Sequence, residues 1–382
     1  MMAGKSVVIL GAGFGGITAA LDLRQGLGAE HSVILIDRQP SFMMGLRKLW
    51  WLVGQGTRAE GVRSRARLAA KGIEFRQASI RAIDLRGRVV HTDANAIRFD
   101  FLIVALGAEP RPDLVPGYSG AVYNLYDVQG IEQLAPRIRE LRAGRVTIGI
   151  LGLPYKCPPA PYEAAMLLDH FFHERGNRDA VELAIFTPQP SSLPVLGTAG
   201  CTRLEAELAQ RRIAFSSACK TVSLDGTTVV ADRARIESDV LIAVPPHRPP
   251  RVVGESGLAL RGDWLAVEPT TLRTSIEGVF AVGDVMEIPL ANGMPLPKAG
   301  IFAEGQAKVA AAAILAELTG QPAPPPYDGQ GYCFVEVGGG KASKVVGAFL
   351  AVPAPQVHLV PPAAAAYAEK QHFEQSRLEA WF

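Results

Sequence analysis

Short apolar runs alternate with longer stretches of helical spacing in the first third of the chain. Lys5 to Leu10 has the character of a short buried strand, and apolar residues recur at helical spacing from Ile17 to Leu27. Ser32 to Ile36 is a second apolar run, so this stretch predicts a strand–helix–strand unit. The next predicted elements are a hairpin-like region over Glu74–Ala78, Ala82–Asp84 and Val89–Thr92, and a buried strand over Phe99–Ala105.

The same alternation restarts in the middle of the chain. Val146 to Leu151 predicts a strand, Tyr162 to Glu174 a helix, and Glu182 to Thr187 the next strand. The elements expected after them are a helix at Arg203–Arg212, short strands that end with Asp239–Val244, and a proline-rich exit from this unit at Pro245–Pro250.

Two further patterns complete the chain. Gly278 to Gly283 predicts one more buried strand, and the Ala-rich stretch Ile301 to Leu318 predicts a helix that ends at Gly320. Residues 327–382 are expected to form a small third unit with a polar helix from about Ala366 to Trp381. Strands that alternate with helices are typical of α/β folds with parallel sheets. We therefore expect two Rossmann-like, doubly wound domains of the dinucleotide-binding type and a small C-terminal α+β unit.

Composition narrows the range of functions. The chain has 382 residues, of which 48% are hydrophobic and 20% charged, and its net charge of +2 argues against a nucleic-acid partner. The N-terminus runs directly into the first strand, and no apolar stretch is long enough to span a bilayer as a helix. A cytoplasmic location is expected, with peripheral contact to the cytoplasmic membrane as an option. The cysteines form no C-x-x-C pair, so no metal site is expected.

A glycine-rich loop between the first strand and the first helix predicts a dinucleotide site. Its glycines allow the backbone to approach a pyrophosphate, and the helix N-terminus supplies N–H donors. Asp37 ends the second strand, where it can accept hydrogen bonds from ribose hydroxyls. Arg38 is a further candidate for cofactor contact, although a solvated arginine is the preferred interpretation. The loop consists of Gly11, Ala12, Gly13, Phe14, Gly15 and Gly16.

Beyond this loop, the chain resembles the flavoprotein disulfide reductase superfamily. The segment from Phe99 to Arg111 is similar to the family's strand that returns to the FAD, and Gly278 to Asp284 is similar to its second FAD motif. Ile80 lies where the family's backbone meets the adenine. The resemblance implies an FAD cofactor. It adds these cofactor-binding residues: Ile80, Ala105, Leu106, Gly107, Gly283 and Asp284, the last as a ligand of the ribityl chain.

The turn that would bind NAD(P)H in the second unit lacks a glycine loop. It runs from Gly152 to Glu163 and contains Pro154, Pro158 and Pro159. Proline has no N–H to donate to a pyrophosphate, so a nicotinamide dinucleotide should bind poorly. The domains are predicted as an FAD-binding domain of residues 1–110 and 265–326, a second Rossmann-like domain of residues 111–264 that does not bind NAD, and a C-terminal unit of residues 327–382.

This proline-rich turn resembles the cysteine motif of sulfide:quinone oxidoreductases and of the flavoprotein subunit of flavocytochrome c sulfide dehydrogenase. Cys157 is followed by Pro-Pro and then Pro-Tyr-Glu, and Cys333 fits the second cysteine of that group. Lys298 fits the segment that passes the flavin ring, where it would stabilise negative charge on the reduced ring. The resemblance implies that sulfide attacks a Cys157–Cys333 disulfide, that Cys333 is nearer the flavin, and that electrons leave through FAD to a quinone or a one-electron carrier.

The chain also departs from those families. No cysteine lies between Pro40 and Leu52, so a covalent flavin link is not expected. The third cysteine of many quinone-linked members, expected between Val115 and Gln129, is absent, which puts growth of long polysulfide chains in doubt. Because Cys157 precedes a predicted helix, the helix dipole should favour its thiolate.

Several alternatives remain open at this stage. One is an NAD(P)H-dependent disulfide or quinone reductase, and another is a non-catalytic, redox-responsive flavoprotein. Cys201 and Cys219 are expected to be inert packing residues. The sequence is compatible with a homo-oligomer. The aromatic residues that would touch a membrane, with core packing as the preferred interpretation, are Trp50, Trp51, Phe349, Phe373, Trp381 and Phe382.

Overall fold

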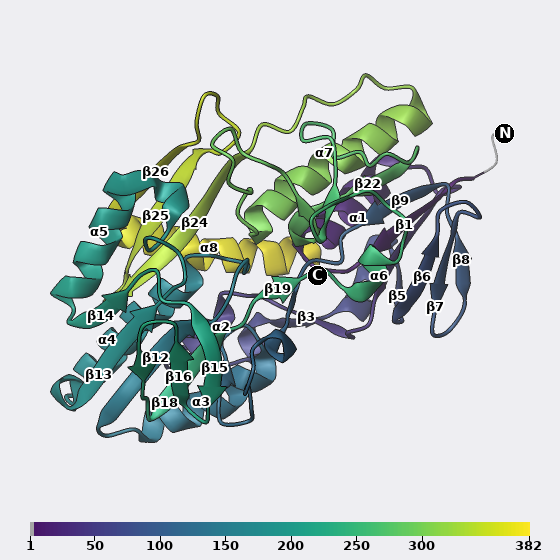
Figure 1. The fold of residues 1–382 in the computed structure, drawn as a ribbon. Helices are drawn as coiled ribbons and strands as arrows, with labels where there is room; N and C mark the ends of the chain where they lie inside the picture. Colours follow the sequence, from purple (N-terminus) through teal and green to yellow (C-terminus); the bar gives the residue numbers. More distant parts are fainter. Residues whose placement is uncertain (1–3) are drawn as a thin grey trace.

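A five-stranded parallel sheet forms the first half of the molecule in the computed structural model, which describes residues 4–382 (Figure 1). The strand order is β22-β9-β1-β2-β5, so a strand from late in the sequence completes a sheet that begins at the N-terminus. Four of its strands are short and largely apolar, as expected where a sheet is covered on both faces, whereas the edge strand β5 is mostly polar. They are β1 (Ser6–Leu10), β2 (Ser32–Asp37), β5 (Glu74–Gln77), β9 (Phe101–Val104) and β22 (Val279–Ala281).

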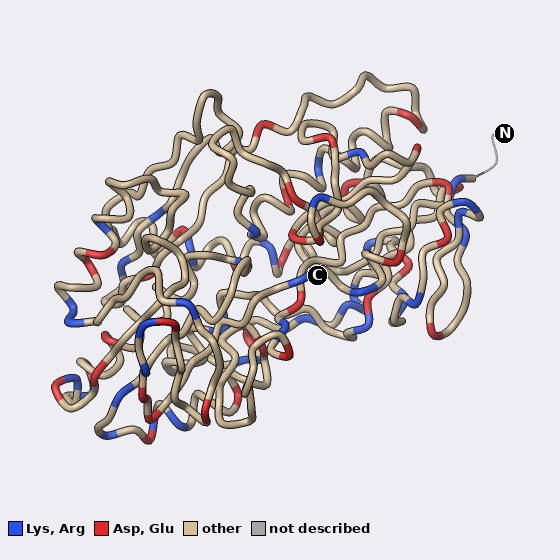
Figure 2. Tube along the Cα trace, viewed as in Figure 1, with Lys and Arg blue, Asp and Glu red and all other residues tan. Residues whose placement is uncertain are grey.

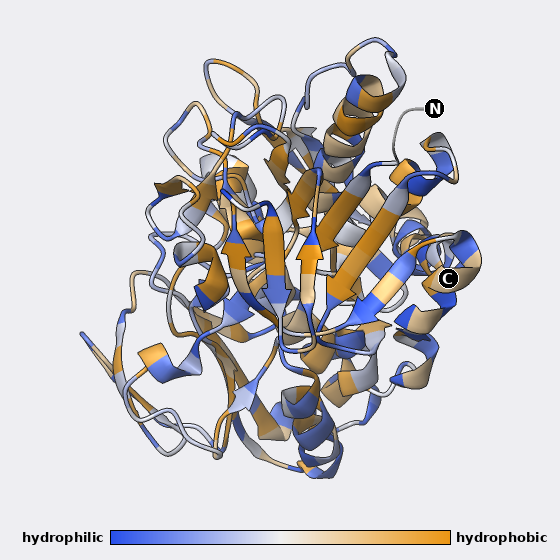
Figure 3. Ribbon diagram, turned by 90° about the vertical axis from the view of Figure 1, so that its right-hand side faces the viewer, coloured by the Kyte–Doolittle hydropathy of each residue, from blue (hydrophilic) through white to orange (hydrophobic). Residues whose placement is uncertain are grey.

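Two helices pack against each other beside this sheet. They are α1 (Phe14–Gly26), which follows β1, and α7 (Gly300–Thr319), which is rich in alanine. In Figure 3 the central strands are hydrophobic along most of their length and polar at their ends. The ends of the strands are therefore where polar chemistry can gather.

Small antiparallel pieces extend from the first sheet. β5 pairs in parallel with β2, so the predicted hairpin is wrong at its first strand: the antiparallel sheet begins only at β6. One piece is a sheet of β6 (Ile80–Asp84), β7 (Val89–Thr92) and β8 (Ala96–Arg98), and the other is β3 (Ser41–Met43) paired with β4 (Val62–Ser64). The short helix α2 (Arg47–Leu52) lies between β3 and β4 in the sequence.

A second five-stranded parallel sheet has the order β11-β18-β12-β13-β14. Its strands are β11 (Tyr123–Asn124), β12 (Gly144–Ile150), β13 (Val181–Phe186), β14 (Ile213–Ser216) and β18 (Val240–Val244). The helices of this half are α3 (Val128–Glu140), α4 (Ala160–Glu174) and α5 (Gly197–Gln210). Two parallel sheets with helices confirm the predicted α/β class.

Shorter elements connect these layers. A three-stranded antiparallel excursion consists of β15 (Thr221–Asp225), β16 (Thr228–Ala231) and β17 (Arg235–Ile236). The connections between the two halves include β10 (Glu109–Pro110), β19 (His247–Arg248), α6 (Arg251–Gly254), β20 (Leu260–Arg261), β21 (Trp264–Ala266) and β23 (Met286–Glu287). β10 pairs with β19 at the crossing between the two halves.

The C-terminal part is a three-stranded antiparallel sheet and a long helix. β24 (Gln330–Gly338) packs on α4 and α7, β25 (Lys341–Ala348) is central, and β26 (Gln356–Ala363) leads into α8 (Ala364–Trp381). In Figure 1 α8, in yellow, runs into the middle of the molecule. The C-terminal part is thus in contact with both parallel-sheet halves. The domain boundaries given above stay a prediction.

The end of α8 packs on the glycine loop. The Phe14 ring is stacked on Phe373 with centroids 6.0 Å apart, and it meets Trp381 edge-on at 5.1 Å. Trp50, Phe349, Phe373 and Trp381 are all buried, so the packing interpretation is correct for these four aromatic residues.

Charges of both signs are interspersed along the trace (Figure 2). Among the helices within residues 4–382, none is both long and apolar enough to cross a bilayer.

Candidate functional site

The glycine loop is held tightly between β1 and β9. Gly11 has φ +95°, and a Cβ at this position would lie 2.4 Å from the carbonyl oxygen of Ala105. A Cβ on Gly16 would lie 1.8 Å from the carbonyl oxygen of Gly11. Both positions therefore exclude any side chain, because helix α1 packs directly on the strand that precedes it.

Open space lies in front of α1. A Cβ on Gly13, the residue before the helix, would meet no atom within 4 Å. No side chain caps this helix start, so the N–H groups of its first turn are available to an anion. Gly107, at the end of the neighbouring strand β9, borders similarly open space and has φ +67°. This arrangement fits the pyrophosphate of FAD.

Asp37 supports the loop as well as facing it. Its carboxylate accepts hydrogen bonds from the backbone N–H of Ala12 at 2.8 Å and from Arg65 at 3.1 Å. Arg65 is buried and also donates to the carbonyl oxygen of Ala12 at 2.7 Å. Arg65 was not predicted, since an isolated arginine far from the motif carries no local pattern.

Two other predicted cofactor residues lie at the edge of this region. Arg38 is a surface arginine, 62% exposed, that pairs with Glu109 at 2.8 Å. Ile80 begins β6 and is half-buried, close to Ala78, whose N–H donates to the carbonyl oxygen of Asp37. Contact of Arg38 and Ile80 with the cofactor stays a prediction.

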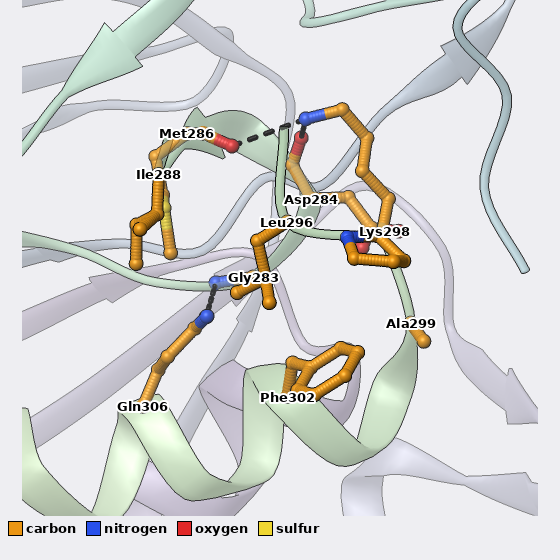
Figure 4. A pocket seen from close by; sticks show the side chains of 10 residues that line it. Gly283, Asp284, Met286, Ile288, Leu296, Lys298, Ala299, Phe302 and Gln306 are labelled. Carbon is orange, nitrogen blue, oxygen red and sulfur yellow. Dashed lines mark hydrogen bonds between the residues drawn. The ribbon is translucent and has the colours of Figure 1, made fainter. Parts of the chain in front are cut away.

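A pocket lies behind the predicted second FAD motif (Figure 4). Gly283 and Asp284 follow β22 in a short turn, and the N–H of Gly283 donates to Gln306 at 2.8 Å. Within residues 4–382 nothing donates a hydrogen bond to the Asp284 carboxylate, and burial raises its pKa. An unpartnered carboxylate at this position fits the ribityl hydroxyls of FAD.

Lys298 lines the same pocket, but its ammonium group is already engaged. It donates to the carbonyl oxygens of Asp284 at 2.9 Å and Met286 at 3.1 Å, as Figure 4 shows, and lies 3.4 Å above the ring centroid of Trp264. Burial lowers the pKa of Lys298 to about 8. Its predicted role toward the reduced flavin ring stays a prediction.

Cys157 occupies a strained turn that is anchored to Lys298. Its φ is +49°, a left-handed conformation that is unfavourable for a residue with a side chain. Its N–H donates to the carbonyl oxygen of Lys298 at 2.6 Å, and its own carbonyl oxygen accepts from the Tyr126 hydroxyl at 3.2 Å. Strain held by surrounding contacts in this way is common at functional sites.

Cys333 lies on β24 and shares its electrostatic surroundings with Cys157. Both thiols are free; Cys157 is exposed and Cys333 is half-buried. Desolvation in the densely packed surroundings raises the pKa of Cys333, and negative charge on Cys157 raises it further. Negative charge on Glu163 acts on both thiols in the same direction. The fold thus brings the two predicted redox cysteines into one neighbourhood.

Burial acts against the predicted effect of the helix dipole on Cys157. Desolvation by the surrounding protein raises the pKa of Cys157 to about 12, with further contributions from Glu163 and Asp284, although its sulfur still reaches the surface. Helix α4 begins three residues later, at Ala160. The dipole effect fades within one helical turn, so burial and two nearby carboxylates outweigh it.

Several cations near Cys157 were not predicted. Lys48 donates to the carbonyl oxygen of Tyr126 at 2.7 Å, and Lys156 donates to that of Ala108 at 3.0 Å. Burial, with the repulsion of Lys156, lowers the pKa of Lys48 to about 8. Burial also lowers the pKa of His247, to about 3, so His247 is neutral at pH 7.

The start of α4 offers few donors to a second dinucleotide. Pro158, Pro159 and Pro161 have no N–H, and the N–H groups of Cys157 and Ala160 are already hydrogen-bonded within the protein. This agrees with the expectation that the second unit binds NAD(P)H poorly.

A buried ionic cluster lies beside the two cysteines. Lys370 donates to Glu163 at 2.6 Å and to Glu336 at 2.7 Å, and all three side chains are almost completely buried. Trp50 donates through its indole N–H to Glu336 at 2.6 Å. Glu163 belongs to the cysteine motif, whereas Lys370, Glu336 and their contact were not predicted.

The two remaining cysteines lie in the core. Cys201 is buried within α5, where its thiol lies 3.1 Å from the carbonyl oxygen of Leu193. Cys219 is buried between β14 and β15. Their predicted burial is confirmed, while Cys201 lies inside its helix rather than ahead of it, because α5 begins at Gly197.

Comparison with known proteins places this geometry in context. Residues 5–152 match the pyridine nucleotide-disulphide oxidoreductase family. The mitochondrial sulfide:quinone oxidoreductase of Mus musculus is 24% identical over 304 residues, which cover 75% of this chain and 66%, just under two thirds, of the mouse protein. The sulfide-quinone reductase of Aquifex aeolicus is 25% identical over 341 residues, 83% of this chain and 78% of that protein.

A third relative and a solved structure extend the comparison. Demethylphylloquinone reductase NdbB of Synechocystis is 27% identical over 339 residues, 83% of this chain and 80% of that protein. The crystal structure of the sulfide:quinone oxidoreductase from Aquifex aeolicus superposes with a TM-score of 0.88 at 22% identity, covering 99% of this chain and 91% of that one. The fold is therefore shared over nearly the whole length of both chains.

Proposed function

This chain is an FAD-dependent oxidoreductase of the sulfide:quinone oxidoreductase-like group within the pyridine nucleotide-disulphide oxidoreductases, and we propose that it oxidises sulfide at Cys157 and Cys333. The observation that carries the proposal is that the two thiols share one electrostatic neighbourhood, in which negative charge on Cys157 or Glu163 acts on Cys333. Cys157 is tied to Lys298, and Lys298 is tied to Asp284. Cys157 is thus connected through hydrogen bonds to the residues that fit the flavin.

The chemistry begins with the pair as a disulfide. Hydrosulfide attacks one sulfur, the S–S bond breaks, a new S–S bond forms to the incoming sulfur, and the other cysteine leaves as a thiolate. Cys157, which is exposed, receives the sulfide, and Cys333, which is half-buried, becomes the thiolate. The disulfide re-forms when the outer persulfide sulfur passes to a second hydrosulfide, giving HSS−, and bound FAD would take up the two electrons and one proton that this releases. A quinone is the proposed final acceptor, in line with the names of the relatives.

Residues around the pair handle charge. Lys298 has a pKa of about 8 and is therefore largely charged at pH 7, where it can balance negative charge near Asp284. Lys48 contributes a second positive charge near Cys157 and favours its anionic form. Lys48 and Lys370 act against the carboxylates that disfavour a thiolate at Cys157.

Anaerobic mixing followed at the flavin absorbance tests the proposal. Sulfide should bleach the flavin rapidly, whereas NADH and NADPH should bleach it at least 100-fold more slowly. Cys157→Ser and Cys333→Ser should keep FAD yet lose sulfide-driven bleaching by several orders of magnitude, and the double variant should lose little more, as for residues that act as a unit. Cys201→Ser and Cys219→Ser are matched controls that should keep sulfide-driven bleaching. Near-normal sulfide oxidation in either redox-cysteine variant would falsify the mechanism.

A further inference from the structure

Two segments, here called the cysteine-bearing elements, each contribute one carboxylate to the buried cluster: α4 together with the Cys157 turn that precedes it, and β24, which carries Cys333. Glu163 lies in the first turns of α4, which begins just after Cys157, and Glu336 lies three residues after Cys333 on β24. The ammonium group of Lys370, from α8, is 2.6 Å from Glu163 and 2.7 Å from Glu336. One lysine therefore joins the two elements that carry the cysteines.

A direct bond between the two elements accompanies this bridge. The backbone N–H of Glu336 donates to the Glu163 carboxylate at 3.2 Å. Each carboxylate oxygen that takes part has a defined donor, so the relative position of α4 and β24 is specified at atomic detail. Lys370 also supplies the positive charge that lets the two carboxylates approach each other.

The position of Lys370 is itself fixed by neighbours on α2 and α8. Its ammonium lies 4.7 Å from the Trp50 ring centroid, and Trp50 donates to Glu336. Arg47 lies 4.8 Å from the same centroid and forms an ion pair with Glu374, one helical turn after Lys370. The lysine is thus held between two helices, with an exposed side-chain fraction of 1%.

Stability alone does not explain such a cluster. Taking charges out of water is costly, and apolar residues of similar volume often stabilise a fold as well or better. The best-attested use of buried ionic groups is to specify the register of packed elements. Here the elements in question carry the two redox cysteines.

We propose that Lys370 is a positioning residue that sets the spacing of Cys157 and Cys333 by bridging one carboxylate from each cysteine-bearing element. This inference rests on the proposed cysteine-pair chemistry. Without the lysine, Glu163 and Glu336 repel each other, so α4 and β24 move apart at this point. A disulfide requires its two Cβ atoms to lie about 3.5 to 4.5 Å apart, so a small separation disfavours the oxidised pair.

The test measures the thiol–disulfide equilibrium of the flavin-bound protein at pH 7. Under anaerobic conditions the protein is equilibrated with reduced and oxidised glutathione, so that two glutathione thiols become one glutathione disulfide for each protein disulfide reduced. Acid quenching, alkylation and peptide mass spectrometry give the fraction of linked Cys157 and Cys333. Both thiols are protonated at pH 7, so the equilibrium reports spacing rather than a change in thiol ionisation.

Lys370→Met should reduce the equilibrium constant for disulfide formation at least tenfold, which corresponds to about 30 mV for two electrons. Adding Glu336→Gln to this variant removes one of the two repelling charges, so the loss should shrink to between threefold and tenfold. Lys344→Met is the matched control. Lys344 also joins the C-terminal sheet to α8, through Glu369 at 2.5 Å, but contacts neither cluster carboxylate, and its variant should stay within threefold of the unmodified protein.

The outcomes separate the two proposals. If the unmodified protein forms no Cys157–Cys333 disulfide at any glutathione ratio, the proposed function fails. If it forms one and Lys370→Met lies within threefold of it, the positioning role is overturned while the proposed function stands. If Lys370→Met does not fold, Lys370→Met combined with Glu336→Gln is measured in its place, because its remaining carboxylate can take up a proton. A normal equilibrium in that variant also overturns the inference.

Discussion

The backbone N–H of Cys157 lies 2.6 Å from the carbonyl oxygen of Lys298, and this hydrogen bond joins the turn before α4 to the segment that leads into α7. It holds Cys157 in its left-handed conformation. The bond therefore links the predicted reactive cysteine to the residue that lines the pocket behind the flavin motif. Several measurable properties of both residues depend on this arrangement.

Replacement of Cys157 by glycine should relieve backbone strain. Because φ is +49° at this position, Cys157→Gly should be more stable than Cys157→Ser by about 1 kcal/mol. The order should reverse at Cys201, which lies inside α5, where glycine is about 1 kcal/mol less favourable than a residue with a side chain. Urea unfolding of the four variants measures both differences. A serine variant more stable than the glycine variant at position 157 contradicts the strained geometry.

The reactivity of Cys157 should depend on pH in an unusual way. Since its pKa is about 12, alkylation by iodoacetamide in a Cys333→Ser background should rise about tenfold per pH unit up to pH 10. The alkylation rate of a free cysteine levels off near its pKa of about 8.5. Because the pKa of this thiol is raised in the folded state, its contribution to the free energy of unfolding is complete below pH 9 and is lost as the pH rises toward 12. A rate that levels off below pH 10 would show that the surroundings do not suppress the thiolate.

Gly13 should be needed for the cofactor rather than for the fold. A Cβ there meets no protein atom within 4 Å, so Gly13→Ala should unfold at the same temperature as the unmodified apoprotein. The added methyl group occupies the space where a pyrophosphate approaches the helix, so FAD affinity should fall at least tenfold. Gly45→Ala, which also adds a methyl group in open space, is the control and should bind FAD normally. Flavin fluorescence titration gives the affinities, and equal affinity in the two variants contradicts the assignment.

Lys298 should leave a mark on stability at alkaline pH. Its folded pKa of about 8 lies below its ordinary value, so the unfolded chain binds more protons between pH 8 and the ordinary lysine range. This group therefore makes the free energy of unfolding rise with pH across that interval. Lys298→Met should lack this rise. The free energy of unfolding of the unmodified protein minus that of the variant, measured in urea without flavin, should therefore increase between pH 7.5 and pH 9.5. An unchanged difference means that the lysine titrates normally.

The sequence predicted the central strands of the parallel sheets well, because buried parallel strands are continuous apolar runs, but it assigned the edge strand β5 to a hairpin and did not predict β11. It was less accurate where propensity and structure disagree. Helix α5 begins at Gly197, six residues before the predicted start. The prediction missed this first part because it includes two glycines, which are weak helix formers. The glycine loop hid the start of α1 in the same way, since Phe14 to Gly16 are already helical.

The candidate site was predictable only where the chain carries a local motif. Gly13, Asp284 and Cys157 lie in short patterns whose chemistry can be deduced. Lys370 and Glu336 lie in no such pattern, because they contact each other and Glu163 from positions far apart in the sequence. Buried charges are also rare, so their burial was not expected. No period or spacing in a single sequence encodes such a meeting, which arises from how β24 and α8 dock on α4.

The packing of Phe14 against Phe373 and Trp381 also has a consequence for biosynthesis. A ribosome adds about 5 to 20 residues per second, so on the order of 20 to 70 s separates the synthesis of the loop from that of the helix that covers it. Throughout that interval Phe14 lacks two of its aromatic neighbours. The nascent N-terminal half thus leaves the ribosome with apolar surface around Phe14 that α8 can cover only after it has itself been synthesised.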